Sequence, residues 1–110
     1  TYPERLPCLE QLDLTKLGAL HFYPFSKEKF PCFSLALEAG KAGGTAPTLL
    51  NGAGEEAVKA FLAGRIGFIQ IAETIQGVLE RIPNGKADCF ETLQEADFKA
   101  RRLANKIIYD

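Results

Sequence analysis

The sequence predicts a mainly α-helical protein, a small four-helix-type bundle preceded by an extended connector arm with at most one short strand. Two observations predict this fold class. From residue 31 onward, apolar residues recur at the 3.6-residue spacing of amphipathic helices, in four stretches separated by glycine or proline. Four of the six prolines fall in the first 31 residues, and each removes a backbone donor and disfavours helix at the residue before it. They are Pro3, Pro7, Pro24 and Pro31.

Residues 1–30 are predicted to form the connector arm. Within them, Leu17–Tyr23 is mostly apolar and lies between Lys16 and Pro24, which predicts one short strand that pairs with a sheet outside this chain. About thirty extended residues reach on the order of 100 Å, enough to cross a whole domain. We therefore divide the chain into a connector, residues 1–30, and a helical bundle domain, residues 31–110.

The first two helices are bounded by proline and glycine. Pro31–Ala42 predicts a short helix, because proline suits the first turn and Gly43-Gly44 supplies a stop. The second helix is expected from about Thr45, a good N-cap, to Ala63, with Gly64 ending it. Its buried stripe is predicted to contain Leu50, Ala53, Ala57, Phe61 and Leu62, with Glu55, Glu56 and Lys59 on the opposite face.

The third helix is expected to follow Arg65-Ile66-Gly67 and to end before Pro83-Asn84-Gly85. Its predicted apolar face contains Phe68, Ala72, Ile75, Leu79 and Ile82.

The last helical segment, Glu91–Tyr109, is predicted to bury Leu93, Ala96, Ala100, Leu103, Ala104 and Ile107. Asp97 is a candidate N-cap of a separate final helix. A domain of about eighty residues is near the size at which one core is only marginally stable, so we expect the bundle to rest against a neighbouring domain.

The composition fits one water-soluble domain, with 46% hydrophobic and 25% charged residues. A net charge of −1 supplies no field toward phosphate backbones or anionic lipid. No apolar run approaches the ~20 residues that span a bilayer, and the first residues lack the apolar core of a signal peptide. We therefore expect no nucleic acid and no membrane as partners. Because the chain contains no methionine, we also expect it to be a piece of a longer protein.

One stretch, Gly52-Ala53-Gly54-Glu55-Glu56-Ala57, formally matches the G-x-G-x-x-G/A dinucleotide-binding fingerprint. The candidate strand before it, Thr48–Asn51, has four residues, and Glu55 and Glu56 would repel phosphate in the first turn of the helix. The favoured interpretation places both glycines inside an amphipathic helix, where another backbone packs closely.

Histidine and cysteine indicate no catalytic or metal residue. His21 is the only histidine, and its apolar surroundings favour a packed ring. The three cysteines, Cys8, Cys32 and Cys89, form no C-x-x-C pair and have no local basic partner that would activate a thiol. An odd number fits neither a disulfide framework nor a zinc site, so we expect reduced thiols in a cytosol and assign them no reaction.

Two polar groups are predicted to have structural roles. Lys99, Arg101, Arg102 and Lys106 form a basic run that favours a solvated helix face, because acidic residues precede it. Asn51 and Glu55 lie one helical turn apart, so their side chains can pair with each other or with an adjoining segment.

A series of short motifs occurs in one order along the chain. The motifs are Thr1-Tyr2-Pro3-Glu4-Arg5, Leu12-Asp13-Leu14, Leu17-Gly18-Ala19-Leu20-His21-Phe22, Phe30-Pro31-Cys32, Gly43-Gly44-Thr45-Ala46-Pro47, Leu50-Asn51 and Ala60-Phe61-Leu62. In that order and at those spacings, they resemble the C-terminal part of the 1-deoxy-D-xylulose 5-phosphate reductoisomerase family. The resemblance covers nearly all 110 residues.

The resemblance implies a parent enzyme with an N-terminal NADPH-binding domain, a central catalytic domain holding a divalent metal (Mg or Mn), and a C-terminal helical domain. It implies rearrangement of 1-deoxy-D-xylulose 5-phosphate and reduction by NADPH to 2-C-methyl-D-erythritol 4-phosphate, for isoprenoid precursors. The reacting groups of that family lie upstream of Thr1. It therefore implies no catalytic, cofactor-binding or metal residue in this chain, which is expected to be an inactive scaffold.

The resemblance also implies an upstream catalytic domain as partner and a homodimeric parent, with Leu17–Tyr23 near the dimer interface. The implied location is the cytoplasm of a bacterium, or a plastid for a plant or algal source.

The chain departs from the family pattern at three places. The family usually has Asn-Ala-Ala-Asn-Glu where this chain has Asn51-Gly52-Ala53-Gly54-Glu55, and each glycine is expected to cost up to about 1 kcal/mol of helix stability unless close packing compensates. Ile69-Gln70 replaces a usual Thr-Asp, removing an N-cap worth about 1 kcal/mol. His21 stands where Thr or Ser is usual.

Two other functions stay open at this point. A stand-alone helical interaction module would use the arm to add a strand to a partner's sheet. A small nucleotide-binding protein built on Gly52 and Gly54 would be stabilised by NADPH or ATP.

Overall fold

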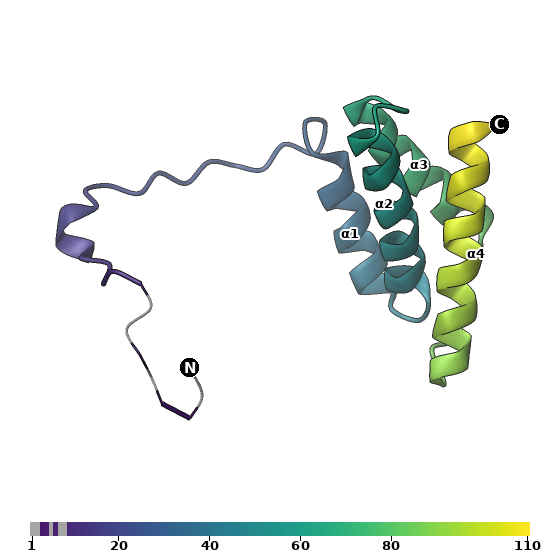
Figure 1. Cartoon of the computed structure of the whole chain (residues 1–110), viewed down its shortest axis with the longest axis horizontal. Helices are drawn as coiled ribbons and strands as arrows, with labels where there is room; N and C mark the ends of the chain where they lie inside the picture. The colour runs from purple at the N-terminus through teal and green to yellow at the C-terminus, as the bar shows by residue number, and fades with distance from the viewer. Residues whose placement is uncertain (1–2, 5, 7–8) are drawn as a thin grey trace.

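The computed structural model describes residues 3, 4, 6 and 9–110, and within these residues it contains four α-helices, one 3-10 turn and no strand. The α-helices are α1 (Pro31–Ala42), α2 (Ala46–Leu62), α3 (Phe68–Arg81) and α4 (Phe90–Tyr109), and the 3-10 turn η1 is Leu14–Lys16. The predicted mainly α-helical class, with a bundle after an extended arm, is confirmed (Figure 1). No helix of the described residues is long and apolar enough to cross a membrane.

The arm before α1 projects away from the bundle on the side of that helix (Figure 1). The Cα radius of gyration, 18.6 Å, exceeds the value of about 13 Å that a compact chain of this length would have. Within the described residues of the arm, the one regular element is the 3-10 turn η1. There the Asp13 carboxylate accepts a hydrogen bond from the Thr15 amide at 3.0 Å. The strand predicted over Leu17–Tyr23 is not formed, because the described residues offer it no strand to pair with.

Helix α2 occupies the centre of the bundle and contacts each of the other three helices, while α3 also contacts α1 and α4. Alanines supply most of the buried apolar residues, and the largest fully buried side chains are Leu49 and Val78. On α4 the buried residues are Ala96, Ala100 and Ala104, all of them on the predicted face. Because these side chains are small, the helix axes approach one another closely.

The two glycines of α2 have different surroundings. A Cβ placed on Gly52 would lie 2.9 Å from the Asp97 carboxylate and 3.2 Å from the Ala100 Cβ. At Gly54 it would meet only the Ile75 Cδ1 atom, at 3.6 Å. The close packing that the sequence predicted at both glycines is therefore present at Gly52 and absent at Gly54.

The N-terminus of α2 is capped by the loop that joins α3 to α4. Thr45 holds the N-cap position, but its hydroxyl makes no bond to the amides of α2. Instead, the Asn84 side-chain oxygen accepts from the Ala46 amide at 3.0 Å. The Gly85 amide donates to the Thr45 hydroxyl at 2.9 Å, and the Thr45 amide donates to the Gly85 carbonyl at 2.9 Å.

The turn before α2 requires glycine at residue 44. Gly43 and Gly44 have φ values of 64° and 58°, in the left-handed region that favours glycine. A Cβ on Gly44 would also overlap the carbonyl oxygen of Gly85. The stop predicted at Gly43-Gly44 is thus also the place where the α3–α4 loop docks.

Three details of the helices differ from the sequence prediction. Phe68 and Leu62 were expected in the core but are 74% and 78% exposed, because Ile71 and Leu49 face the core instead. Helix α4 is continuous, so Asp97 is a mid-helix residue and not an N-cap. The N-cap of α3 is Gly67, so Ile69-Gln70 lies inside the first turn and the predicted loss of an N-cap there is wrong; Gln70 accepts a hydrogen bond from the Gly67 amide at 2.7 Å.

We predict that Gly54→Ala raises the free energy of unfolding by about 0.5–1 kcal/mol, because alanine favours the helix and its methyl group fits. Gly52→Ala should lower the free energy of unfolding by about 1 kcal/mol, because the added methyl group overpacks against α4 and this destabilisation exceeds the gain in helix propensity. Urea unfolding measures both. Gly40→Ala, where nothing lies within 4 Å of the added Cβ, is the matched control and should resemble Gly54→Ala. Equal effects at residues 52 and 54 would contradict the difference in packing.

Candidate functional site

The glycine fingerprint does not lie at a helix N-terminus. Helix α2 begins at Ala46, so Gly52 and Gly54 stand in its interior, and Thr48–Asn51 is helical where a nucleotide fold has a strand. The carboxylate of Asp97 lies against Gly52, 2.9 Å from where a Cβ on that residue would be. These residues do not fit a bound dinucleotide, since the site lacks free amides and presents a negative charge.

The histidine and the described cysteines are scattered over exposed positions. His21 is exposed, and the packed ring favoured from the sequence is wrong, because the arm carries the residue away from the bundle. Cys32 and Cys89 are free and exposed, and the Cys89 sulfur lies 3.2 Å from the Thr92 hydroxyl. Cys8 lies outside the described residues. Within the part of the chain that is described, no three His, Cys, Asp or Glu side chains come together to hold a metal ion.

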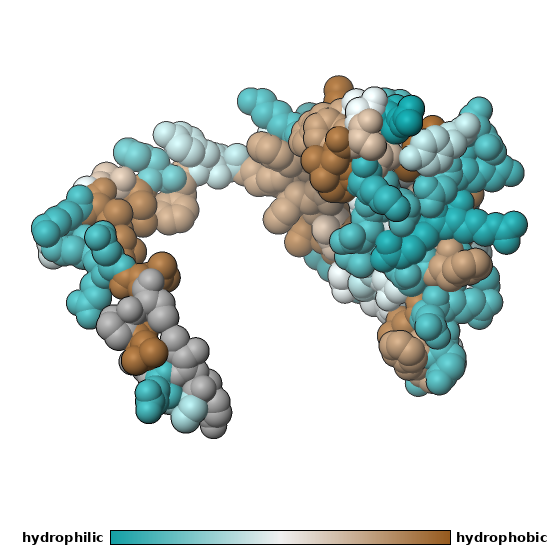
Figure 2. Space-filling model, in the orientation of Figure 1, coloured by the Kyte–Doolittle hydropathy of each residue, from teal (hydrophilic) through white to brown (hydrophobic). Residues whose placement is uncertain are grey.

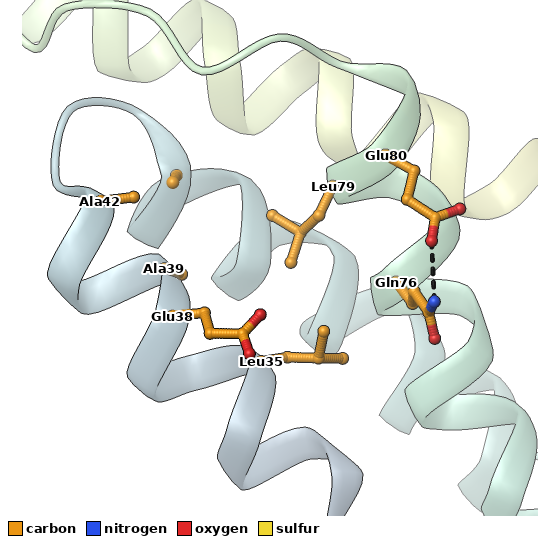
Figure 3. A pocket seen from close by; sticks show the side chains of 8 residues that line it. Leu35, Glu38, Ala39, Ala42, Gln76, Leu79 and Glu80 are labelled. Atoms are coloured by element: carbon orange, nitrogen blue, oxygen red, sulfur yellow. Dashed lines mark hydrogen bonds between the residues drawn. The ribbon is translucent and has the colours of Figure 1, made fainter.

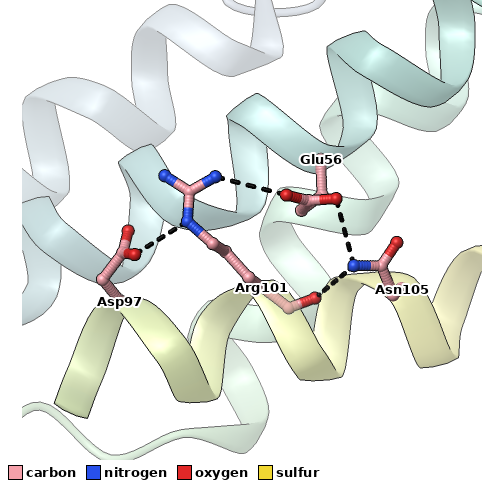
Figure 4. Close-up of polar contacts among 4 residues, drawn as sticks. All are labelled: Glu56, Asp97, Arg101 and Asn105. Carbon is pink, nitrogen blue, oxygen red and sulfur yellow. Dashed lines mark hydrogen bonds and ion pairs between the residues drawn. The ribbon is translucent and has the colours of Figure 1, made fainter. Parts of the chain in front are cut away.

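Four polar residues connect α2 to α4 (Figure 4). Arg101 donates from Nε to Asp97 at 2.7 Å and from a terminal nitrogen to Glu56 at 3.2 Å. Asn105 donates to the other Glu56 oxygen at 3.1 Å and to the Arg101 carbonyl at 3.0 Å. We call Glu56, Asp97, Arg101 and Asn105 the polar clamp. It contains an interhelical pair that buries most of Glu56, whose side chain is 15% exposed.

The polar clamp shifts the titration of its charged members. The hydrogen bond from Asn105, followed by that from Arg101, holds the pKa of Glu56 below its usual value, although burial opposes this. The Asp97 carboxylate, followed by Glu56, raises the pKa of Arg101. The sequence placed both Glu56 and Arg101 on solvated faces. That prediction is wrong for this pair, because the register of α2 against α4 brings them together.

The other polar candidates stay at the surface. Lys99 pairs with Glu95 at 2.7 Å on the outer face of α4, and Arg102 and Lys106 are exposed, as predicted for a solvated face. Asn51 and Glu55 are exposed on α2, and no hydrogen bond joins them in the described part of the chain. Their expected pairing is not formed here.

None of the eight phenylalanines, all within the described residues, belongs to the buried core. Several line a groove of about 480 Å³ where the arm meets the bundle, between residues 28–33 and the start of α3. We call Phe30, Phe33, Phe68 and Ile69 the phenylalanine groove, and their exposed fractions are 58%, 50%, 74% and 73%. The space-filling view shows hydrophobic surface at this junction and along the arm (Figure 2).

Ring contacts shape the phenylalanine groove. The Phe25 ring lies 4.5 Å from that of Phe33 and 5.9 Å from that of Phe30, and Phe68 meets Phe61 edge-on at 5.8 Å. These contacts orient the rings without covering them. Exposed apolar patches of this kind mark interaction surfaces. Sequence periodicity missed the groove because it assigned Phe68 to the core, although the concentration of phenylalanine near residue 30 was a usable signal.

A second hollow, of about 320 Å³, lies between α1, the start of α2 and the end of α3 (Figure 3). Its apolar wall includes Leu35 and Leu79, and its polar groups are the Glu38 and Glu80 carboxylates and Gln76. Gln76 donates to Glu80 at 2.7 Å. The lining carries acidic and no basic side chains, so it does not suit a phosphate-bearing ligand.

Comparison with known proteins identifies relatives across the whole chain. A family model described as the DXP reductoisomerase C-terminal domain matches residues 1–103. The chain is 47% identical over 110 residues to 1-deoxy-D-xylulose 5-phosphate reductoisomerase of Geobacillus sp. (strain WCH70), covering 98% of this chain and 29% of that protein. It is also 47% identical over 110 residues to the protein of that name from Cupriavidus pinatubonensis, covering 99% and 28%.

Solved structures show the same fold. The reductoisomerase from Zymomonas mobilis in complex with NADPH superposes with a TM-score of 0.86 at 34% identity, covering 99% of this chain and 29% of that one. A DOX-P reductoisomerase in complex with magnesium gives a TM-score of 0.81 at 33% identity, covering 97% and 29%. The chain therefore spans less than a third of the length of these relatives.

The polar clamp predicts a pH-dependent part of stability. Because the pKa of Glu56 is lower in the folded than in the unfolded chain, its contribution is complete above the unfolded pKa, about 4.3, and is lost as pH falls through the folded pKa. Urea unfolding between pH 7 and pH 3 should show that Glu56→Gln lacks this loss. Glu55→Gln, an exposed neighbour on the same helix, should keep the wild-type profile. Parallel profiles for wild type and Glu56→Gln would contradict the prediction.

Proposed function

The chain belongs to the 1-deoxy-D-xylulose 5-phosphate reductoisomerase family, whose C-terminal domain model it matches over residues 1–103, and on that basis we propose that it is the structural C-terminal domain of such an enzyme. The proposed reaction of the whole enzyme converts 1-deoxy-D-xylulose 5-phosphate to 2-C-methyl-D-erythritol 4-phosphate with NADPH and a divalent metal. Support comes from the names of the relatives and from the NADPH and magnesium in two structural neighbours.

The residues of this chain do not fit either of those groups. The glycine fingerprint is filled by Asp97 and Ala100, and the described residues gather no set of metal ligands. We assign the chemistry that these groups supply to the part of the enzyme outside this chain. The proposed role of this chain is to pack against the catalytic domain and support it.

The observation that carries the scaffold proposal is the phenylalanine groove, whose large apolar side chains are exposed while alanines fill the core. The groove includes Phe30 and Pro31, where the arm joins α1, so the segment that connects this domain to the rest of the enzyme starts at the groove. The arm itself exposes further large apolar residues, Leu9, Leu12, Leu14, Leu20, Phe22 and Tyr23. We propose that the catalytic domain of the same enzyme covers the phenylalanine groove and these apolar residues of the arm.

Domain organisation, assembly and location follow from the same proposal. We place the connector at residues 1–30 and the helical domain at residues 31–110, which is supported by the start of α1 at Pro31. The homodimeric parent enzyme, the position of Leu17–Tyr23 near its interface, and a bacterial cytoplasmic or plastid location stay predictions.

We predict that the pure 110-residue chain does not oxidise NADPH in the presence of 1-deoxy-D-xylulose 5-phosphate and Mg²⁺ or Mn²⁺. The reason is that its residues hold neither the coenzyme nor the metal. Absorbance of NADPH measures turnover, and a thermal shift with NADPH or ATP measures binding, with a full-length relative as the positive control. Turnover by the chain, or its stabilisation by the nucleotide, would refute the scaffold assignment.

A second prediction concerns the phenylalanine groove. In the full-length enzyme, Ile69→Ser should lower the free energy of unfolding by about 2 kcal/mol or more, the loss expected at the centre of an interface. Phe98→Ser, at a 65% exposed position on α4 away from the groove, is the control and should have little effect. In the isolated chain each substitution should change the free energy of unfolding by no more than about 0.5 kcal/mol, as at other surface positions. Equal losses for both variants in the full-length enzyme would count against docking at the groove.

A further inference from the structure

We propose that Asn84-Gly85 is a site of spontaneous deamidation through a succinimide, and that its contacts with Thr45 hold the reaction in check in the folded bundle. The sequence singles out this dipeptide only as a helix breaker. In an Asn-Gly pair, the glycine has no side chain to hinder attack of its backbone nitrogen on the asparagine side chain. Both residues are exposed to water, so the later hydrolysis has its co-reactant.

The reaction balances without an oxidant or an enzyme. The Gly85 nitrogen attacks the Asn84 Cγ atom, a new C–N bond closes the ring, and the Cγ–Nδ2 bond breaks. Ammonia leaves with the proton that the Gly85 amide gives up. One water molecule then opens the succinimide at either carbonyl, which produces aspartate or isoaspartate at residue 84.

Hydrogen bonds hold both reacting groups. The attacking nitrogen donates its proton to the Thr45 hydroxyl at 2.9 Å. The Asn84 side-chain oxygen accepts from the Ala46 amide at 3.0 Å and from the Thr45 hydroxyl at 3.3 Å. A further bond, from the Thr45 amide to the Gly85 carbonyl at 2.9 Å, fixes the peptide that follows. Attack requires the Gly85 nitrogen to leave Thr45, which is itself only 4% exposed.

The two products have opposite consequences for the bundle. Aspartate keeps the accepting oxygen and places a negative charge at the N-terminus of α2, where the helix dipole favours it. Isoaspartate inserts a methylene into the backbone and moves the Gly85 carbonyl away from the Thr45 amide. That carbonyl also occupies the space that a Cβ on Gly44 would fill, so its present position depends on the glycine there. Ring opening to isoaspartate would therefore detach the α3–α4 loop from the start of α2.

The chain contains an internal reference. Asn51-Gly52 is a second Asn-Gly pair, but it lies within α2, with Gly52 buried against α4. Its glycine amide belongs to the helix hydrogen-bond ladder, so attack there requires α2 to unfold. Deamidation at residue 51 thus reports unfolding of the helix, whereas deamidation at residue 84 reports opening of the loop alone.

The test measures deamidation at both pairs by peptide mass spectrometry during incubation of the 110-residue chain near neutral pH. In the folded wild type, residue 84 should react on the order of tenfold or more slowly than in the same chain in urea. Thr45→Val keeps the shape of the side chain and removes its hydroxyl. It should raise the deamidation rate at residue 84 on the order of tenfold, the factor expected for loss of a partly buried hydrogen bond. In Thr45→Ser the deamidation rate at residue 84 should stay near that of the wild type. The deamidation rate at residue 51 should be the same in every folded variant.

Three results would overturn the proposal. One is a rate at residue 84 that is the same in the folded chain and in urea. Another is a Thr45→Val rate equal to that of wild type. The third is equal acceleration at residues 51 and 84 in Thr45→Val, which would mean general unfolding in place of local release.

Discussion

The close approach of α2 to α4 is the constraint on which the rest of the bundle depends. At Gly52 a single added carbon would lie 2.9 Å from Asp97, so the two helices meet over small residues. Because α2 contacts all three other helices, its distance from α4 fixes where α3 and α1 can pack. The same approach brings Glu56 within reach of Arg101, so the polar clamp is a consequence of the small residues beside it.

A core made mainly of alanine buries little apolar area per residue, and burial supplies most of the stabilisation of a domain. Several large apolar side chains, Phe30, Phe33 and Phe68 among them, lie instead at the surface where the arm joins the bundle. This distribution suits a domain that completes its burial against another one. Figure 2 shows hydrophobic surface both along the arm and where the arm joins the bundle, with hydrophilic residues between the two.

The sequence predicted the helices well and the contacts between them less well. Helix bounds depend on neighbours in sequence, and proline and glycine mark them, so α1 falls at Pro31–Ala42 as expected. Periodicity finds apolar faces but does not distinguish the core from a surface that awaits a partner, which is why Phe68 was assigned to the core. Contacts such as Thr45 with Asn84, 39 residues apart, depend on tertiary register that no local pattern contains. The family resemblance was specific because it used motif order along the whole chain.

In the proposed enzyme, another domain of the same chain covers the phenylalanine groove. Hydrogen–deuterium exchange of the isolated chain and of the full-length enzyme tests it most directly. We expect the amides of Phe33 and of the first turns of α3 to exchange more slowly in the full-length enzyme, and those on the outer face of α4 near Lys99 to exchange at the same rate in both proteins. Identical exchange at the groove in both proteins would contradict it.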